Sequence, residues 1–287
     1  MTMCLRPINL RDDDGRYRQV PCGRCNACLM RARAEWAFRV RNEWRNSDYA
    51  YFVTLTYDNM NLPIAELIDE ETGAYFYSGV VLKKDVQLFI HYLRRKFPKK
   101  SLRYYAISEY GNKGRSHYHM ILFFKNAGEV SQEELLRKIK SIWKSPEVSV
   151  GPLDEGGVLY ATTYCFDRWQ SDPGLPPNFR LMSRNPGIGA NYVDTHKEYL
   201  RSGMKFVVYD NGFVNLPRYY RLKVYTPDEL NERFEDMQFK ISEEIRKRVS
   251  DPSFDPESFD RKRKKEEEDY IRQTNKTIYK KKYRSKL

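Results

Sequence analysis

The side chains best suited to chemistry lie in the stretch "EYGNKGRSHYHMILFF", which runs from Glu109 to Phe124. Two of the chain's four histidines, His117 and His119, stand one residue apart in it. Side chains alternate between the two faces of a β-strand, so both imidazoles point to one face if this stretch is extended. Imidazoles are common metal ligands, but an isolated His-x-His pair is more often a polar strand edge.

A third polar side chain strengthens the metal interpretation. The β-rich stretch "LRYYAISEY" precedes the histidines, and the polar, Gly-rich "GNKGRS" between them predicts a hairpin. A turn centred on residues 112–115 sets Glu109 opposite His117 on the same face, with Cβ atoms about 5 Å apart. Two imidazoles and a carboxylate with open coordination positions suit Mg²⁺ or Mn²⁺. We therefore predict a metal site at Glu109, His117 and His119, whose shell phosphate oxygens could complete.

A metal at such a site favours phosphoryl chemistry, which requires a nucleophile. Tyr160 and Tyr164 are four residues apart in the predicted helix "VLYATTYCFDRW", so both phenols lie on one helical face. The spacing alone is a weak signal, because ordinary packing also produces it and the chain has 22 tyrosines. A free phenol has a pKa near 10, so a catalytic tyrosine needs activation by a base, a cation or a metal.

Four of the five cysteines form a second candidate metal site. Cys22, Cys25 and Cys28 read C-x2-C-x2-C, Cys4 is a plausible fourth ligand, and Cys165 stands apart. Four thiolates make a closed tetrahedral Zn²⁺ site of structural character. Such a site would fix the N-terminal segment to the Arg-rich helix that follows. Reduced thiols and an iron–sulfur cluster remain alternatives.

The elements that must position these residues follow a β-α-β-β-α-β-α order. Apolar spacing predicts helices and alternation predicts strands, with a capping box at Ser131 and Glu134 before the third helix. A basic helix at 29–46 precedes them. This order predicts an α+β fold of split-βαβ type, a central, mainly antiparallel sheet with helices on one face. The segments are 49–58, 79–97, 102–110, 117–124, 132–144, 147–153 and 158–169.

Three regions differ in composition, and we expect boundaries near residues 48 and 225. Residues 1–48 hold the cysteines and the basic helix, 49–225 the sheet domain, and 226–287 a charged helical tail. From 171 to 222 no strong periodicity is visible, and "MSRNPGIGANYV" and "LPRYYR" read as turns. The end, "KTIYKKKYRSKL", is rich in cations, and nonspecific phosphate binding is its expected contribution.

The charge balance indicates a polyanionic partner. The chain has 51 Lys and Arg against 39 Asp and Glu, a net charge of +12, with many aromatic residues among the cations. Aromatic rings stack on unpaired bases while cations contact phosphates, so we expect single-stranded nucleic acid. The candidate DNA contacts are Arg31, Arg39, Arg115 and Arg168.

No apolar run approaches the roughly 20 residues of a membrane span, and the N-terminus lacks the apolar stretch of a signal peptide. We therefore expect a cytoplasmic protein with reduced thiols and no membrane partner.

Three motifs in this order resemble those of the HUH superfamily of single-strand endonucleases: "FVTLTYD", "EYGNKGRSHYHMILF" and the Tyr-x-x-x-Tyr helix. Three more segments, "VPCGRCNACLMRARAEWAFR", "MSRNPGIG" and "LPRYYR", resemble the replication initiators of gokushovirus-type microviruses. The resemblance covers about residues 1 to 225. It implies a DNA nicking and joining endonuclease for rolling-circle replication in the cytoplasm of a bacterial host.

The resemblance also implies roles for the candidate residues. A metal at Glu109, His117 and His119 polarises a phosphate at the viral origin, and Tyr160 or Tyr164 forms a 5′-phosphotyrosine link. The released 3′-OH primes the host DNA polymerase, and the second tyrosine cuts the regenerated origin. With no Walker-type loop in the sequence, unwinding falls to a host helicase.

One feature departs from the family pattern. Tyrosine helices of this superfamily commonly carry a lysine three residues beyond a tyrosine, where this chain has Thr163 and Asp167, and Arg168 is the nearest cation. The activating group thus stays open. A rival tyrosine pair, Tyr192 and Tyr199, has the wrong spacing. Two other functions remain open: a non-catalytic single-stranded DNA-binding or packaging protein, and a relaxase or transposase.

Sequence-specific recognition of the origin could use either of two segments. One is the predicted hairpin "ELIDEETGAYFYSG" at 66–79, and the other is the "NPGIG" loop at 185–189.

Overall fold

The structure is a computed structural model, and it divides into two compact units. One unit is Trp36–Asp194, and the other joins Met1–Glu35 with Thr195–Leu287. The domain boundaries expected near residues 48 and 225 stay predictions. The described residues are 4, 6–11, 15, 17–68, 73–98, 101–111, 115–126, 128–164, 175–203, 206–209, 212–253, 255–258, 260–261, 264–265 and 268–269.

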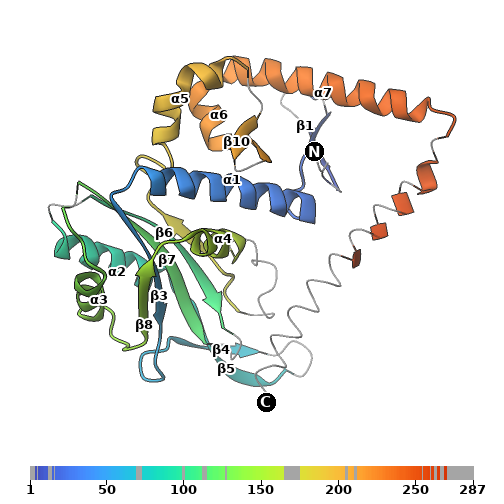
Figure 1. Cartoon of the computed structure of the whole chain (residues 1–287). Coiled ribbons are helices and arrows are strands. Elements are labelled where there is room, and N and C mark those ends of the chain that lie inside the picture. The colour runs from blue at the N-terminus through green and yellow to red at the C-terminus, as the bar shows by residue number, and fades with distance from the viewer. Residues whose placement is uncertain are drawn as a thin grey trace. The chain divides into compact units, whose positions relative to one another are not determined.

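The unit Trp36–Asp194 is built on a five-stranded sheet in the order β8-β3-β7-β6-β9. Every neighbouring pair is antiparallel, which confirms the predicted α+β class with a central antiparallel sheet (Figure 1). A separate hairpin of β4 and β5 occupies the segment predicted as one. The strands are β3 (Tyr49–Thr56), β4 (Ile64–Ile68), β5 (Tyr75–Gly79), β6 (Ser101–Tyr110), β7 (Ser116–Lys125), β8 (Val148–Pro152) and β9 (Arg180–Met182).

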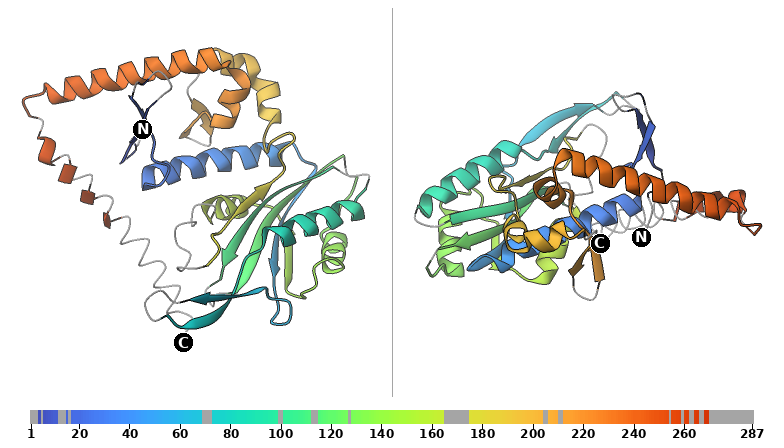
Figure 2. Two further views of the ribbon diagram at one scale, coloured as in Figure 1. Left: turned by 180° about the vertical axis from the view of Figure 1, so that it is seen from behind. Right: turned by 90° about the horizontal axis from the view of Figure 1, so that it is seen from above.

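Helices α2 (Lys83–Lys96) and α3 (Gln132–Lys140) cover one face of this sheet, and both views show them side by side (Figures 1 and 2). The predicted apolar stripe of α2 is buried, and it packs with the residues of β3, β6 and β7 that point to this face. Helix α3 begins as predicted, because the Ser131 hydroxyl accepts a hydrogen bond from the Glu134 N–H at 3.1 Å.

The opposite face is covered too, so the prediction of helices on one face only was wrong. Helix α4 (Glu155–Tyr164) and the second half of α1 (Asn26–Arg45) pack there against β6 and β7. Arg41 Nε donates to Glu155 Oε2 at 2.6 Å and joins the two helices. The basic helix predicted at 29–46 is therefore real, but its apolar side had been assigned no partner. Helix α4 also begins earlier than expected, within the "DEGG" segment.

The segment after residue 174 holds more regular structure than its sequence suggested. Strand β9 has only three residues, too few to show an alternating pattern, and it gains its order by pairing with β6. The segment "LPRYYR" was predicted as a turn, but Arg218 begins helix α6 (Arg218–Val224) directly after Pro217. Proline is well tolerated at the start of a helix, where its missing N–H is not needed.

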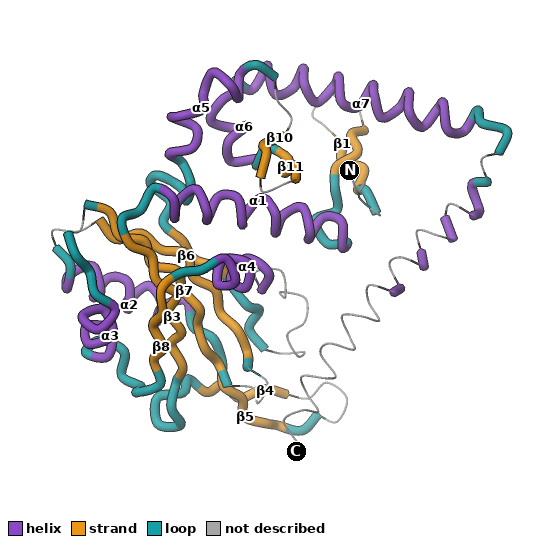
Figure 3. Tube along the Cα trace, viewed as in Figure 1, coloured by secondary structure: helices purple, strands orange, loops and turns teal. Residues whose placement is uncertain are grey.

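The second unit contains the N-terminal and C-terminal elements (Figure 3). The helix predicted from Thr226 is α7 (Pro227–Val249), and the basic end of the chain lies outside the described residues. Arg18 Nη1 donates to Asn231 Oδ1 at 2.9 Å, which joins β2 to α7. No helix in the described ranges is long and apolar enough to cross a bilayer. The other elements are β1 (Ile8–Arg11), β2 (Tyr17–Val20), α5 (Asn191–Arg201), β10 (Phe206–Tyr209) and β11 (Gly212–Asn215).

Candidate active site

The hairpin of β6 and β7 brings the three predicted metal ligands together. Glu109 is directly opposite His117 in the strand register, as predicted, and the Gly111 N–H donates to the Arg115 carbonyl at 2.9 Å where the strands part. His119, two residues further along β7, returns to the same face of the sheet. One ligand atom from each of Glu109, His117 and His119 lies within 4.8 Å of the other two. The three side chains therefore form one group that could hold a metal ion.

The distances within this group are short and its members are largely buried. Nε2 of His119 lies 3.2 Å and Nε2 of His117 lies 3.6 Å from Oε2 of Glu109. Glu109 is 8% exposed and His119 is 7% exposed, whereas His117 is half-buried. The two imidazole rings are almost perpendicular, with centroids 4.8 Å apart. One side of the group thus remains accessible to a ligand through His117.

The Nδ1 atoms of both imidazoles are held by other groups. Nδ1 of His117 lies 3.2 Å from the Arg115 carbonyl, which can only accept, so this nitrogen carries the hydrogen. The neutral ring then presents the lone pair of Nε2 to the centre of the group. Nδ1 of His119 lies 3.0 Å from the Thr54 hydroxyl on β3, which holds that ring in the same sense. Partners of this kind fix ring orientation in metal sites.

The Glu109 carboxylate stays ionised despite its burial. Burial alone raises the pKa of a carboxyl group, but hydrogen bonds with His117 and His119 outweigh it and lower the pKa of Glu109 to about 2. A buried anion that faces two imidazoles is a favourable place for a cation. The donor set of one carboxylate oxygen and two imidazole nitrogens suits Mn²⁺ or Mg²⁺ when phosphate oxygens complete the shell.

Helix α4 places one of the predicted tyrosines directly at this group. The Tyr160 hydroxyl donates to Oε2 of Glu109 at 2.9 Å and lies 3.3 Å from Nε2 of His119. Phe52 on β3 supports both rings, with centroids 5.6 Å from the His119 ring and 6.1 Å from the Tyr160 ring. Tyr164 is the last residue of α4, and its side chain lies outside the described residues.

The predicted DNA-contacting arginines differ in their surroundings. Arg39 is 8% exposed, and its Nε donates to the Ile188 carbonyl at 3.0 Å, so we leave it out of the proposed DNA surface. Arg115 is half-buried and donates to the Tyr57 carbonyl and to Asn59 Oδ1, at 2.8 and 2.6 Å. Arg31 is half-buried on α1. Arg168, the cation nearest to the tyrosines in the sequence, lies outside the described residues.

Arg180 on β9 is a cation that the sequence analysis did not single out. Ile107 pairs with His119 on one side and with Arg180 on the other, so the arginine shares the sheet face of the metal-ligand candidates. Its guanidinium lies over the Trp36 ring, 4.1 Å from the centroid. Nε and Nη1 of Arg180 are buried without a hydrogen-bond partner among the described residues. A buried guanidinium with free donors suits an anion such as phosphate.

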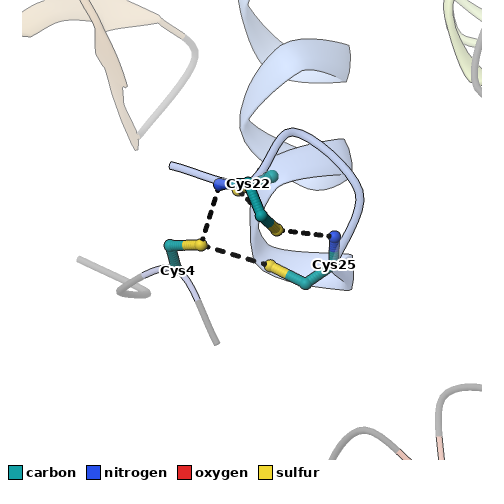
Figure 4. A group of neighbouring side chains, drawn as sticks. Cys4, Cys22 and Cys25 are labelled. Carbon is teal, nitrogen blue, oxygen red and sulfur yellow. Dashed lines mark hydrogen bonds between the residues drawn. The ribbon is translucent and has the colours of Figure 1, made fainter. Parts of the chain in front are cut away.

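The four predicted cysteine ligands also come together, in the other unit. Their sulfur atoms all lie within 4.8 Å of one another, with 3.9 Å between Cys4 and Cys25 and 4.0 Å between Cys22 and Cys28. A tetrahedral Zn²⁺ with bonds of about 2.3 Å separates its sulfur ligands by about 3.8 Å. Figure 4 shows the sulfurs of Cys4 and Cys25 turned toward each other, with Cys4 on a separate segment from the loop that leads into α1.

Backbone groups around the cysteines favour thiolates. Burial opposes the ionisation of Cys22, but the N–H groups of Arg24 and Cys25 donate to its sulfur at 3.4 and 3.3 Å and lower the pKa of its thiol to about 7. The Cys22 N–H donates to the sulfur of Cys4 at 3.2 Å. Burial raises the pKa of the Cys4 and Cys28 thiols, so a bound cation is needed before all four ionise. The group therefore fits a structural zinc ion.

The fold and the candidate site together define an α+β protein with a phenol beside a potential metal centre, and the comparisons name its class. Residues 50–168 match the model of a family described as Replication-associated protein ORF2, and they include every metal-ligand and tyrosine candidate of the sheet unit. This segment of the chain belongs to that family of replication-associated proteins, which confirms the class that the sequence motifs predicted.

A particular relative narrows the class. The chain is 23% identical over 222 residues to Replication-associated protein VP4 of Bdellovibrio phage phiMH2K, an alignment that covers 70% of this chain and 66% of the relative. The chain thus spans slightly less than two thirds of that protein's length. No solved structure matches the chain significantly. These matches place the chain among phage replication-associated proteins.

Proposed function

We propose that this chain initiates rolling-circle replication of a phage genome, as a metal-dependent endonuclease that nicks and rejoins single-stranded DNA at the origin. One observation carries this proposal. The Tyr160 hydroxyl lies 2.9 Å from Glu109 and 3.3 Å from His119, at the centre of the three-residue candidate metal group. A phenol beside a metal group matches what a nucleophile for phosphodiester cleavage requires. The family match over residues 50–168 supports the same assignment.

Glu109, His117 and His119 hold the metal ion through one carboxylate oxygen and two Nε2 atoms. Bound there, Mg²⁺ or Mn²⁺ supplies Lewis-acid polarisation of the scissile phosphate. Thr54 and the Arg115 carbonyl keep the imidazoles turned toward the ion, because each binds an Nδ1 atom. Arg180, on the same sheet face, offers the cation that the tyrosine helix lacks in its usual lysine position.

Cleavage exchanges one phosphate ester for another. The Tyr160 oxygen forms a bond to the phosphorus as its proton leaves, and the bond from the phosphorus to the 3′ oxygen breaks. The 3′ oxygen takes up a proton and departs as a free hydroxyl, and the 5′ side remains on the protein as a phosphotyrosine. The ester energy is retained, so rejoining by the reverse reaction needs no nucleotide cofactor.

Tyr164 is assigned the second cut. It is the last residue of α4, one helical turn after Tyr160, and that spacing puts both residues on one face of the helix. The second phenol can then attack the regenerated origin while the first still carries DNA, which circularises the displaced strand. The host DNA polymerase extends the free 3′-OH and a host helicase unwinds the duplex, in the cytoplasm of the bacterial cell.

The proposal also includes a structural Zn²⁺ at Cys4, Cys22, Cys25 and Cys28. This ion would hold the Cys4 segment against the start of α1 in the unit that contains both. The matching sulfur separations and the N–H···S hydrogen bonds support it. Because all four positions are protein thiolates, the ion would have a structural rather than a catalytic role.

Adduct formation tests the nicking proposal. Full-length protein with Mn²⁺ and a labelled origin-strand oligonucleotide should give a covalent protein–DNA band on a denaturing gel. Tyr160→Phe should reduce its initial rate by at least about 10³-fold, because the variant keeps the fold but lacks the oxygen that attacks. Tyr192→Phe is the matched control, a tyrosine from the rival pair, and should leave the rate unchanged.

Two results would contradict the assignment. An adduct that forms at the normal rate in Tyr160→Phe would exclude this nucleophile for the first cut. Cleavage retained by His117→Ala/His119→Ala would exclude the metal site. A protein that binds the oligonucleotide but never forms an adduct would instead be a non-catalytic single-stranded DNA-binding protein.

A further inference from the structure

A second concave surface of the unit Trp36–Asp194 lies near the start of β6. An open cavity of about 750 Å³ is bordered by β6, by β9 and by the loop of residues 184–186 that follows it. A second cavity of about 570 Å³ adjoins it over the exposed side of α2. Both are lined by Gln87, Arg94 and Tyr104, so the two cavities form one continuous surface, which we call the basic groove.

The charges of the basic groove are strongly one-sided. Glu43 is its only acidic lining residue, and the cationic lining residues are Arg94, Arg95, Arg103, Lys125 and Arg184. The Glu43 carboxylate is already engaged, because Arg103 forms an ion pair with Oε1 and the Gly189 N–H donates to Oε2 at 2.7 Å. Four cations therefore remain without a carboxylate partner among the described residues.

These four cations are exposed and little engaged by the fold. Arg95 and Arg184 have neither a hydrogen-bond nor an ion-pair partner among the described residues. Arg94 Nε makes only a long contact of 3.4 Å to the Leu102 carbonyl, and Lys125 Nζ donates to Asn46 Oδ1 at 3.0 Å. Their charge is thus available to an anion from outside the protein.

The groove also has an aromatic and apolar component. Tyr104 is half-buried in it, and the Arg94 guanidinium lies 5.7 Å from the centre of its ring. Leu181 and Met182 on β9 and Phe123 on β7 contribute further apolar surface. A cavity of this volume can accommodate a nucleotide-sized group, and a mixture of rings and cations suits an unpaired base with its phosphates.

We infer that the basic groove binds single-stranded DNA, with a base against Tyr104 and neighbouring phosphates on Arg94, Arg95 and Arg184. Duplex DNA fits the groove poorly, because its bases are paired and stacked inside and cannot enter a concave pocket. The inference rests on the proposed function, since the strand that lies in the groove is the one whose scissile phosphate lies at Tyr160.

The groove is separate from the candidate active site. Tyr104 precedes Glu109 by five residues on β6, which is about 17 Å along a strand at 3.4 Å per residue. A DNA strand that reaches both sites must therefore extend several nucleotides beyond the cut. The loop that begins the "NPGIG" segment contributes Asn185 and Pro186 to the cavity, so this segment, and not the β4–β5 hairpin, contacts the bound strand.

Binding of a fluorescent single-stranded oligonucleotide tests the inference. Measurements use the full chain with Tyr160→Phe and no added Mg²⁺ or Mn²⁺, so that no covalent step contributes. Arg95→Gln/Arg184→Gln should lose roughly 20-fold in affinity at 0.1 M salt, and its log–log salt slope should fall by about 1.4, because each phosphate contact contributes about 0.7. Lys140→Gln/Lys144→Gln removes the same charge from α3 and from the segment after it, outside both cavities, and should bind like the parent protein.

Equal affinities of the groove variant and the control variant would overturn the inference, as would an equal loss of affinity for duplex DNA. Photocrosslinking of the parent protein with iododeoxyuridine oligonucleotides gives a second readout. A crosslink to the peptide that begins at Tyr104, several nucleotides from the cut, is expected, and crosslinks confined to β7 or α4 would contradict it. Because neither readout requires cleavage, failure of the nicking proposal would leave both intact.

Discussion

At the scale of single residues, the candidate site depends on what holds the two imidazoles in place. His117 is held by a backbone carbonyl that no substitution can remove, but His119 is held by the Thr54 hydroxyl at 3.0 Å. Thr54 does not touch the metal group itself, so it is a positioning residue. Its contribution can therefore be separated from that of the ligands.

Thr54→Val should weaken Mn²⁺ binding by about 10-fold or more, because an outer hydrogen bond to a ligand histidine is lost while side-chain shape is kept. Isothermal titration of the DNA-free protein with Mn²⁺ measures this effect. Thr56→Val is the matched control: Thr56 lies on the same strand and the same sheet face, but its side chain has no hydrogen bond among the described residues. Equal Mn²⁺ affinities for the two variants would exclude the role of Thr54.

The sequence predicted the ligands but not the residues that support them. Glu109 and His117 could be paired because a short hairpin connection fixes which residues face each other. Thr54 lies 65 residues before His119, and Arg180 reaches the site only through a three-residue strand. Neither position follows from local spacing. Arg39 shows the reverse error, because charge alone does not distinguish a buried, hydrogen-bonded guanidinium from one that faces solvent.

At the scale of elements, helix α4 must lie close to the sheet for Tyr160 to reach Glu109. Gly157 makes this approach possible. A Cβ atom at Gly157 would lie 3.0 Å from Cδ2 of Phe52 and 3.3 Å from Cδ1 of Leu153. At Gly156 the nearest atom would be Oδ1 of the exposed Asp154 side chain, at 3.3 Å, which can move.

Gly157→Ala should therefore push α4 away from β3 and slow adduct formation, with a loss of about 1–3 kcal/mol of stability from overpacking. Gly156→Ala, one residue earlier, should be neutral or slightly stabilising, because alanine favours a helix by up to about 1 kcal/mol over glycine. Thermal unfolding and the initial rate of adduct formation measure both effects. A Gly157→Ala protein as stable and as active as Gly156→Ala would show that α4 does not depend on this contact.

The predicted elements were most accurate where a long periodic pattern existed. The stripe of α2 and the alternation of β3 were confirmed, and so was the long helix α7. The second covered face was missed because the apolar residues of α1 and α4 indicate burial but not the partner. The helix α6 was missed because seven residues rich in aromatics and cations show little amphipathic pattern.

At the scale of the whole molecule, the two candidate metal groups belong to different compact units. Glu109, His117 and His119 lie in the unit Trp36–Asp194, and the four cysteines lie in the other. Their ligands also differ in chemistry, since thiolates favour Zn²⁺ and the carboxylate–imidazole set favours Mn²⁺ or Mg²⁺. We therefore expect two metals that can be removed separately.

Protein purified without oxygen should contain about one zinc per chain, and Cys28→Ser should reduce that content severalfold while leaving the Mn²⁺ affinity of the other group unchanged. Elemental analysis measures the zinc, and the same analysis for iron tests the iron–sulfur alternative. Cys165→Ser removes the one cysteine outside the group and should keep its zinc. Zinc contents that are equal in Cys28→Ser and Cys165→Ser would contradict the four-cysteine site.

The identity of the residue that becomes linked to DNA tests the central claim most directly. The covalent complex formed with Mn²⁺ and an origin oligonucleotide can be digested with nuclease and protease, and its modified peptide sequenced by mass spectrometry. The proposal predicts a 5′-linked nucleotide on Tyr160 when a single cut is allowed. A nucleotide on any residue outside α4, or a complete absence of linked nucleotide under conditions where the DNA is bound, would contradict it.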